Sequence, residues 1–273
     1  MERKTFAQEL HKRAIKKYPR RKVTVFRPDE IWAVDLASME SLAESNDGYK
    51  WILCIVDVFS KYAFCVPLKT KSAQTVLAAM KEVVKKSGRS PEKIWCDRGS
   101  EFYNKYFKEW IKSQNITMYS TYGESKSAVV ERFIRTLREL LAKKFTASGS
   151  TAWVKMLPNV VKYYNHKFHK SIQMSPLAAS DPKNAIQVFL LHQSKKEKKG
   201  KKPNFHVGDP VRISVTKEKF EKGSTENWSR EVFAVYKVLK TNPITYKLLD
   251  RHGDVIEGSF YAQELQKTAE KFR

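Results

Sequence analysis

Apolar and polar positions between residues 31 and 169 repeat with two different periods. Short runs rich in Ile, Val and aromatic residues, bounded by polar or turn residues, predict buried strands. Such runs cover residues 31–37, 49–59, 93–97 and 116–121. The run 61–68 follows 49–59 after a short turn at Ser60, which predicts a hairpin-like pair.

Longer segments between these runs have apolar residues at helical spacing. In residues 72–88, Val76, Leu77 and Met80 share one face, and Gly88 is a natural helix stop. The other predicted helices cover residues 104–115, 127–145 and 153–169. Three strands followed by alternating helices and strands predict an α/β domain with a mixed sheet.

The pattern changes after a Lys-rich run, HQSKKEKKGKKP, at residues 192–203. Its like charges predict an extended, solvated connection. Beyond it, short alternating segments with turn signals predict a small β-barrel, with Trp228, Phe233, Tyr236 and Tyr246 in its core. The predicted organisation is a basic N-terminal arm at 1–28, a core at 29–185, a linker at 186–203 and the barrel at 204–268.

Charge narrows the class of partner. The net charge is +23, with ten Lys and Arg against two acids in residues 1–28 and a near-neutral 204–273. Such a field favours a polyanion, and nucleic acid fits better than a membrane because no amphipathic helix with a broad apolar face accompanies it. Another acidic partner remains the alternative. Arg20, Arg21 and Lys22 in the arm are predicted to contact DNA phosphates, which makes binding sensitive to salt.

The remaining composition indicates the compartment. No apolar run approaches the roughly 20 residues of a membrane span, and the N-terminus lacks the apolar region of a secretory signal. We therefore expect a soluble, intracellular protein without a membrane partner. Cys54, Cys65 and Cys96 form no C-x-x-C pair and predict buried, reduced thiols, with no structural zinc in this chain.

Three carboxylates are candidates for chemistry. Asp35 lies inside the apolar strand 31–37, Asp97 closes the strand 93–97, and Glu131 lies early on the helix 127–145. Phosphoryl transfer at a DNA backbone uses paired Mg²⁺ ions, which prefer carboxylate oxygens on a rigid scaffold. A single strand Asp or helix Glu is more often a cap or a surface charge, so spacing alone leaves both interpretations open.

Ordered motifs around these acids resemble a known family. The motifs are DEIWAVDLASM (29–39), GYKWILCIVDVFSKYAFCVPLKTK (48–71), IWCDRGSEFYN (94–104) and STYGESKSAVVERFIRTLREL (120–140). In this order they resemble the core of the retroviral-integrase superfamily, most closely the integrases of Maverick/Polinton-type DNA transposons. The resemblance implies an RNase H-like five-stranded mixed sheet flanked by helices, plus a small C-terminal SH3-like β-barrel.

The same resemblance implies the site. It assigns catalysis and metal binding to Asp35, Asp97 and Glu131, with Mg²⁺ or Mn²⁺ as cofactor. It implies that Arg135 and Arg138 lie along the DNA backbone. Partners would be double-stranded DNA, as element ends and as target, and further copies of the chain in a homo-oligomer.

Two departures from the family are visible. The interval between Asp97 and Glu131 is 33 residues, two shorter than the 35 of the retroviral motif. The residues before the core contain no His-His-Cys-Cys zinc module, since His11 has no cysteine partners, so either the protein lacks that module or it lies on sequence outside this chain. The loop 120–127 is expected to absorb the shorter interval, and its Ser125 and Lys126 are candidates for DNA contact.

Neighbouring residues receive structural roles. Asp57 is expected to stabilise a turn, and Glu101 to pair with Arg98 or another local base. Gly99 is expected to give the backbone freedom after Asp97.

The sequence therefore predicts a DNA integrase or transposase that performs metal-dependent 3′-end processing and strand transfer. The nucleus is the expected location, given the substrate and the Lys-rich stretches. Two alternatives stay open: a domesticated, inactive DNA-binding protein, and an RNase H-like nuclease that cuts without joining.

Overall fold

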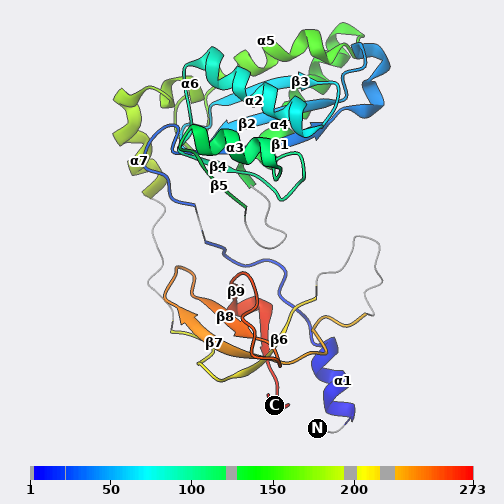
Figure 1. Cartoon of the computed structure of the whole chain (residues 1–273), viewed down its shortest axis with the longest axis vertical. Coiled ribbons are helices and arrows are strands. Elements are labelled where there is room, and N and C mark those ends of the chain that lie inside the picture. Colours follow the sequence, from blue (N-terminus) through cyan, green and yellow to red (C-terminus); the bar gives the residue numbers. More distant parts are fainter. Residues whose placement is uncertain (1–2, 22, 121–127, 194–201, 216–224, 273) are drawn as a thin grey trace. The chain divides into compact units, whose positions relative to one another are not determined.

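The computed structural model describes residues 3–21, 23–120, 128–193, 202–215 and 225–272 (Figure 1). The chain divides into two compact units. We call residues 24–196 the core unit, and residues 1–23 together with 197–273 the β-unit. In the described part of the chain, no helix combines the length and the apolar character needed to cross a membrane.

A five-stranded mixed sheet forms the centre of the core unit. Its order is β3-β2-β1-β4-β5, with β1 antiparallel to β2, β2 antiparallel to β3, and β4 parallel to both β1 and β5. The strands are β1 (Ile31–Ser38), β2 (Trp51–Asp57), β3 (Ala63–Leu68), β4 (Lys93–Trp95) and β5 (Thr117–Tyr119). The predicted mixed sheet and its five strands are thereby confirmed.

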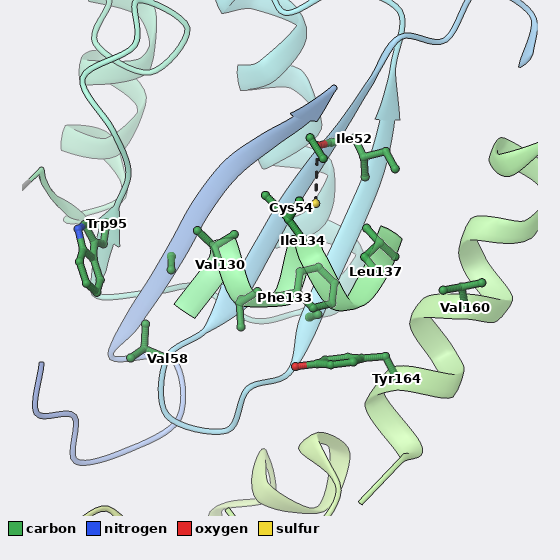
Figure 2. Close-up of a cluster of buried hydrophobic side chains, with 14 of the residues drawn as sticks. Ile52, Cys54, Val58, Trp95, Val130, Phe133, Ile134, Leu137, Val160 and Tyr164 are labelled. Atoms are coloured by element: carbon green, nitrogen blue, oxygen red, sulfur yellow. Dashed lines mark hydrogen bonds between the residues drawn. The ribbon is translucent and has the colours of Figure 1, made fainter. Parts of the chain in front are cut away.

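Helices cover both faces of this sheet (Figure 1). They are α2 (Ala73–Ser87), α3 (Lys105–Ser113), α4 (Ala128–Ser148), α5 (Trp153–His166), α6 (Pro176–Ala179) and α7 (Ala185–Gln193). Successive β1 residues point to opposite faces, as a strand requires. Ala33 packs in one cluster with α4 and α5, and Trp32 packs in the other with α2 and α3. Figure 2 shows the cluster on the α4 and α5 side.

Local capping explains where the predicted helices begin and end. The Ser72 hydroxyl accepts a hydrogen bond from the Thr75 backbone N–H at 3.3 Å, at the start of α2. Gly88 ends α2 with φ of 64°, and its N–H donates to the Val84 carbonyl at 3.1 Å. Short 3-10 turns occur at Glu40–Leu42, Glu44–Asn46, Pro182–Asn184 and Ala262–Glu264. The predicted stop at Gly88 is confirmed.

The β-unit contains an antiparallel sheet of order β10-β6-β7-β8-β9. Its strands are β6 (Pro210–Ile213), β7 (Phe233–Leu239), β8 (Thr245–Leu249), β9 (Phe260–Tyr261) and β10 (Leu265–Lys267). The predicted closed barrel is not confirmed, because β9 and β10 are the sheet's two edges in the described residues. Trp228, Phe233 and Tyr246 are buried as predicted, whereas Tyr236 is 50% exposed. The register between β7 and β8 shifts at this residue, which turns its side chain outward.

The N-terminal segment is part of the β-unit. Helix α1 (Arg3–His11) buries Leu10, whose carbonyl accepts from the backbone N–H groups of Asn227 and Trp228 at 2.8 and 3.2 Å. The division of the chain thus differs from the predicted one, in which residues 1–28 form a separate arm. It also differs after residue 185, because α7 occupies the first half of the predicted linker and buries Val188 against the core unit.

Candidate active site

Asp35 and Asp97 lie on neighbouring strands of the core unit. In the parallel pairing of β1 with β4, Ala33 lies opposite Trp95, and each is two residues before one of the acids. β4 ends at Trp95, and we infer from this register that Asp35 and Asp97 lie close together. Because side chains alternate along a strand, Asp35 lies on the face of β1 on which Ala33 meets α4. Both acids are half-buried.

The electrostatics of the buried thiols support this proximity. Burial raises the pKa of Cys96 to about 12, and the carboxylates of Asp97, Glu101 and Asp35 add to the shift. Burial also raises the pKa of Cys54, with contributions from Cys65 and Asp35. Cys54 lies directly opposite Asp35 in the pairing of β1 with β2. The negative charge of three carboxylates thus acts on the Cys96 thiol.

The turn after Asp97 has a specific local structure. One Asp97 carboxylate oxygen accepts a hydrogen bond from the Gly99 backbone N–H at 3.1 Å. A side chain at Gly99 would collide with the Glu101 carboxylate, and the φ of Gly99 is not among the positive ones. Gly99 therefore does not supply a left-handed backbone, which corrects the expectation from the sequence, and a Cβ there would displace the flexible end of Glu101. The contact also brings the Glu101 carboxylate close to the turn after Asp97, whereas the sequence predicted only that it pairs with Arg98 or another local base.

Glu131 lies in the first turn of α4, where its side chain is exposed. Helix α4 packs on the sheet through Val130, Ile134 and Leu137 (Figure 2). Seven residues after Glu131, about 10 Å along the helix, Arg138 donates a hydrogen bond to the Ser38 carbonyl at 3.3 Å. This bond ties α4 to the end of the strand that carries Asp35.

The metal-binding role of the three acids remains a prediction. Across residues 3–120 and the other described ranges, no group of three or more His, Cys, Asp or Glu side chains is gathered closely enough to hold a metal ion. Two carboxylates on neighbouring strand ends nevertheless suit Mg²⁺, which keeps several water ligands and commonly uses one or two protein carboxylates with substrate phosphates. The donor set of Asp35 and Asp97 therefore fits this ion.

A hollow beside Asp97 adds residues that the sequence analysis missed. Arg98, Tyr103, Tyr119 and Ser120 line a volume of about 490 Å³. The Tyr119 ring stacks on Trp95 at 6.0 Å between centroids, and Arg98 Nε donates to the Ser120 hydroxyl at 3.3 Å. The available signals were Tyr119, the last residue of β5, and Tyr103, in the segment between β4 and α3. The hollow offers ring faces and a cation next to the acids.

Asp57 has the structural role expected from the sequence. It is fully buried, and its carboxylate accepts from the Phe59 and Ser60 backbone N–H groups at 3.2 and 3.1 Å and from the Ser60 hydroxyl. Burial raises its pKa, while these hydrogen bonds act in the opposite direction. Asp57 therefore stabilises the turn between β2 and β3.

The predicted DNA contacts are only partly described. Arg135 is exposed on α4, and Arg20 and Arg21 are exposed on the β-unit. The Arg20 guanidinium lies 5.2 Å from the Tyr18 ring centre, and the Arg21 backbone N–H donates to the Tyr261 hydroxyl at 2.8 Å. Ser125, Lys126 and Lys22 lie outside the described residues.

Comparisons with known proteins show which proteins the chain resembles. Residues 25–121 match the family model of the integrase core domain. A transposon-derived protein of Caenorhabditis elegans is 33% identical over 195 residues, which are 71% of this chain and 65% of that protein. The Gag-Pol polyprotein of avian reticuloendotheliosis virus is 31% identical over 137 residues, which are 49% of this chain and 12% of the polyprotein.

A solved structure resembles the chain in fold. It is a chain of the simian T-cell lymphotropic virus intasome, in complex with the PP2A regulatory subunit B56 gamma. The TM-score is 0.68 at 14% identity, over 96% of this chain and 86% of that chain. Residues 25–121 are thus similar to the integrase core domain, and the chain is similar to retroviral polyproteins and to a transposon-derived protein. It spans about two thirds of the worm protein and a small part of the viral polyprotein.

Proposed function

We propose that this protein is a metal-dependent DNA strand transferase of the integrase and transposase class. The parallel register of β1 and β4, in which Ala33 and Trp95 lie opposite each other two residues before Asp35 and Asp97, is the observation that carries the proposal. Glu131, on the helix packed over these strands, would be the third acid. We also propose that the protein is most similar to the integrases of Maverick/Polinton transposons and that its β-unit corresponds to an SH3-like C-terminal domain.

Each part of the site has a distinct role. Asp35 and Asp97, with Glu131, would hold Mg²⁺ or Mn²⁺. When bound, the metal would activate the attacking oxygen and stabilise the leaving one. Arg135 and Arg138 would bind phosphates of the same DNA strand. Water would first cut a phosphodiester near the element end, and the freed 3′-hydroxyl would then attack target DNA.

The β-unit would supply much of the DNA affinity. Residues 204–273 are near neutral, but residues 1–23 carry nine Lys and Arg against two acids. Residues 3–21 belong to the β-unit, and the described cations of this segment are exposed on its surface: Lys12, Arg13, Lys16, Lys17, Arg20 and Arg21. Phosphate contacts of this kind give affinity with little sequence specificity. We also propose that the protein acts in the nucleus and as a homo-oligomer that pairs two DNA ends.

A branched DNA duplex of arbitrary sequence tests the reaction without knowledge of the element ends. Strand transfer exchanges one phosphodiester for another, so the enzyme can run it in reverse and resolve the branch. With Mg²⁺ or Mn²⁺, the wild-type protein should release the joined and the freed strands. Asp97→Asn should lower the rate more than about a hundredfold, as expected for loss of a metal ligand. Asp47→Asn is the matched control, since Asp47 is exposed and its φ of 52° suits Asn.

The same assay separates the alternatives. Cleavage without joining would identify an RNase H-like nuclease. Binding without any cleavage, in a protein of unchanged circular dichroism, would identify a domesticated DNA-binding protein. Equal activity of Asp97→Asn and the wild type would contradict the assignment of the site.

A further inference from the structure

A second pocket of the core unit lies between α4, the end of α5 and the turn after β2. Its volume is about 280 Å³. Val56, Val129, Phe133, Leu140 and Tyr164 contribute apolar walls. Phe133 and Tyr164 meet edge to face at 4.8 Å between ring centres, and Figure 2 shows Tyr164 reaching from α5 toward Phe133. This size suits a single small ligand and not a duplex.

Basic side chains surround this apolar floor. Lys61, Arg132, Lys167 and Lys170 line the pocket, and among its described lining residues none is an acid. His169 lies between them and is half-buried. Burial, Lys61 and Arg132 together lower the pKa of His169, so the fields of the two cations converge on its imidazole. The pocket thus has a positive potential from a fixed arrangement of groups.

The rim carries aromatic rings. The Phe168 side chain is 59% exposed, and Tyr163, which precedes the pocket on α5, is 54% exposed. The Lys167 ammonium lies 5.6 Å from the Tyr163 ring centre. Exposed rings next to cations bind nucleobases by stacking while the cations hold the phosphate. A free phosphate would leave the apolar walls without contact.

We propose that this pocket binds one unpaired nucleotide of DNA, with its base on the apolar walls and Phe168, and its phosphate facing Arg132, Lys167 and Lys170. The proposal rests on the DNA-joining function proposed above, because Arg132 directly follows Glu131 on α4. A nucleotide held there would fix a single-stranded DNA tail beside the helix that carries the third acid.

Photocrosslinking with the full-length chain tests the pocket directly. The probe is a duplex with a four-nucleotide single-stranded tail containing 5-iodouracil, and the reference is the same duplex with a blunt end. With the tailed duplex, the crosslinked protein residues should fall within 163–171. Deoxyadenosine 5′-monophosphate should compete better than deoxyadenosine or inorganic phosphate, since the pocket would bind both parts.

Two substitutions separate the pocket from surface charge. Thr136→Trp fills the pocket from the α4 wall, and Lys170→Glu reverses one of its cations. Each should remove most of the affinity gained from the tail, which is at least about fivefold for one stacked base, and leave binding of the blunt duplex nearly unchanged. Lys162→Glu is the matched control, because Lys162 is exposed on α5 and is not among the lining residues.

The outcomes decide the proposal. The proposal would be overturned if Lys170→Glu and Lys162→Glu lost equal affinity for the tailed duplex. It would also be overturned if inorganic phosphate competed as strongly as the nucleotide. Displacement of the tail by an acidic peptide and not by the nucleotide would overturn it as well. If the wild type resolves branched DNA but binds the tailed duplex no more tightly than the blunt one, the pocket proposal fails and the proposed reaction stands. If the tail binds and no joining occurs, the proposed reaction fails and the nucleotide site stands.

Discussion

Arg212 on β6 donates a hydrogen bond to Glu9 of α1, 203 residues earlier in the chain, with 3.3 Å between Nε and the carboxylate oxygen. The Arg212 side chain has no exposed surface, and its other donors reach Glu270 at 2.7 Å and the Ser229 carbonyl at 3.0 Å. One buried guanidinium therefore holds both ends of the described chain. The core unit is inserted between two segments of a single β-unit.

Glu9→Ala should weaken the docking of α1. The substitution leaves Arg212 with one carboxylate instead of two and removes the acceptor of the Thr268 hydroxyl, which lies 2.7 Å away. We expect a loss of about 2–4 kcal/mol in the stability of the β-unit, as for a broken buried pair. Hydrogen exchange should rise in residues 3–21. Glu226→Ala is the control, since its pair with Arg230 is exposed and should be worth under about 1 kcal/mol.

Salt dependence should identify the cations that contact DNA. Arg20→Ala and Arg21→Ala should each lower the slope of log affinity against log salt concentration by about 1 on duplex DNA, with little dependence on sequence. Arg27→Ala should leave the slope nearly unchanged, because Arg27 already pairs with Glu92 at 2.7 Å. A slope that responds to Arg27 and not to Arg20 or Arg21 would argue against a DNA contact by this segment. Fluorescence anisotropy at several salt concentrations measures this slope.

Among the cations of the core unit, Arg89 should contribute most to its stability. Its guanidinium lies 2.6 Å from Asp29 and 3.6 Å from the buried Asp57, and it stacks 4.9 Å from the Tyr62 ring centre. Arg89→Ala leaves Asp29 and Asp57 without the cation that they share. It should lower the free energy of unfolding of the core unit by about 3 kcal/mol. Denaturation followed by tryptophan fluorescence reports it, since five of the six tryptophans lie in residues 24–196. Similar losses for Arg89→Ala and the exposed Arg27→Ala would contradict this role.

The core unit was predictable because its local signals agree with its packing. The strand 31–37 and the helix 72–88 have apolar periods that match the buried faces of β1 and α2, and Ser72 and Gly88 cap that helix. Asp35 and Asp97 became candidates as acids in or after an apolar strand, and the resemblance of the surrounding motifs to the integrase superfamily assigned them to catalysis. Their adjacency required the parallel register, which connects residues about 60 positions apart and has no local signal.

The β-unit was less predictable for a physical reason. Helix α1 has few apolar residues, and it is positioned by Leu10 and by the Glu9 pair with a partner far along the chain. The surrounding residues 1–28 carry ten Lys and Arg, which is typical of a solvated arm, so no signal in the sequence indicated that Leu10 is buried. The pocket at Arg132 was missed similarly, because it combines residues 56–61, 129–140 and 164–171.

The groups around His169 should set the pH at which its imidazole titrates. Burial, Lys61 and Arg132 lower its pKa below the ordinary 6.5, and its Nδ1 lies 3.0 Å from the Ser171 hydroxyl. The lowered pKa means that the folded core unit gains stability from a neutral imidazole above pH 6.5, and loses it as the pH falls through the folded pKa. His169→Gln should therefore flatten the decline of tryptophan-monitored stability between pH 7 and pH 5, and His252→Gln, at an exposed position, should not. Arg132→Gln should raise the pKa of His169 in an NMR titration. A bound nucleotide phosphate should raise it in the wild type as well, and an unchanged titration at saturating nucleotide would place the phosphate elsewhere.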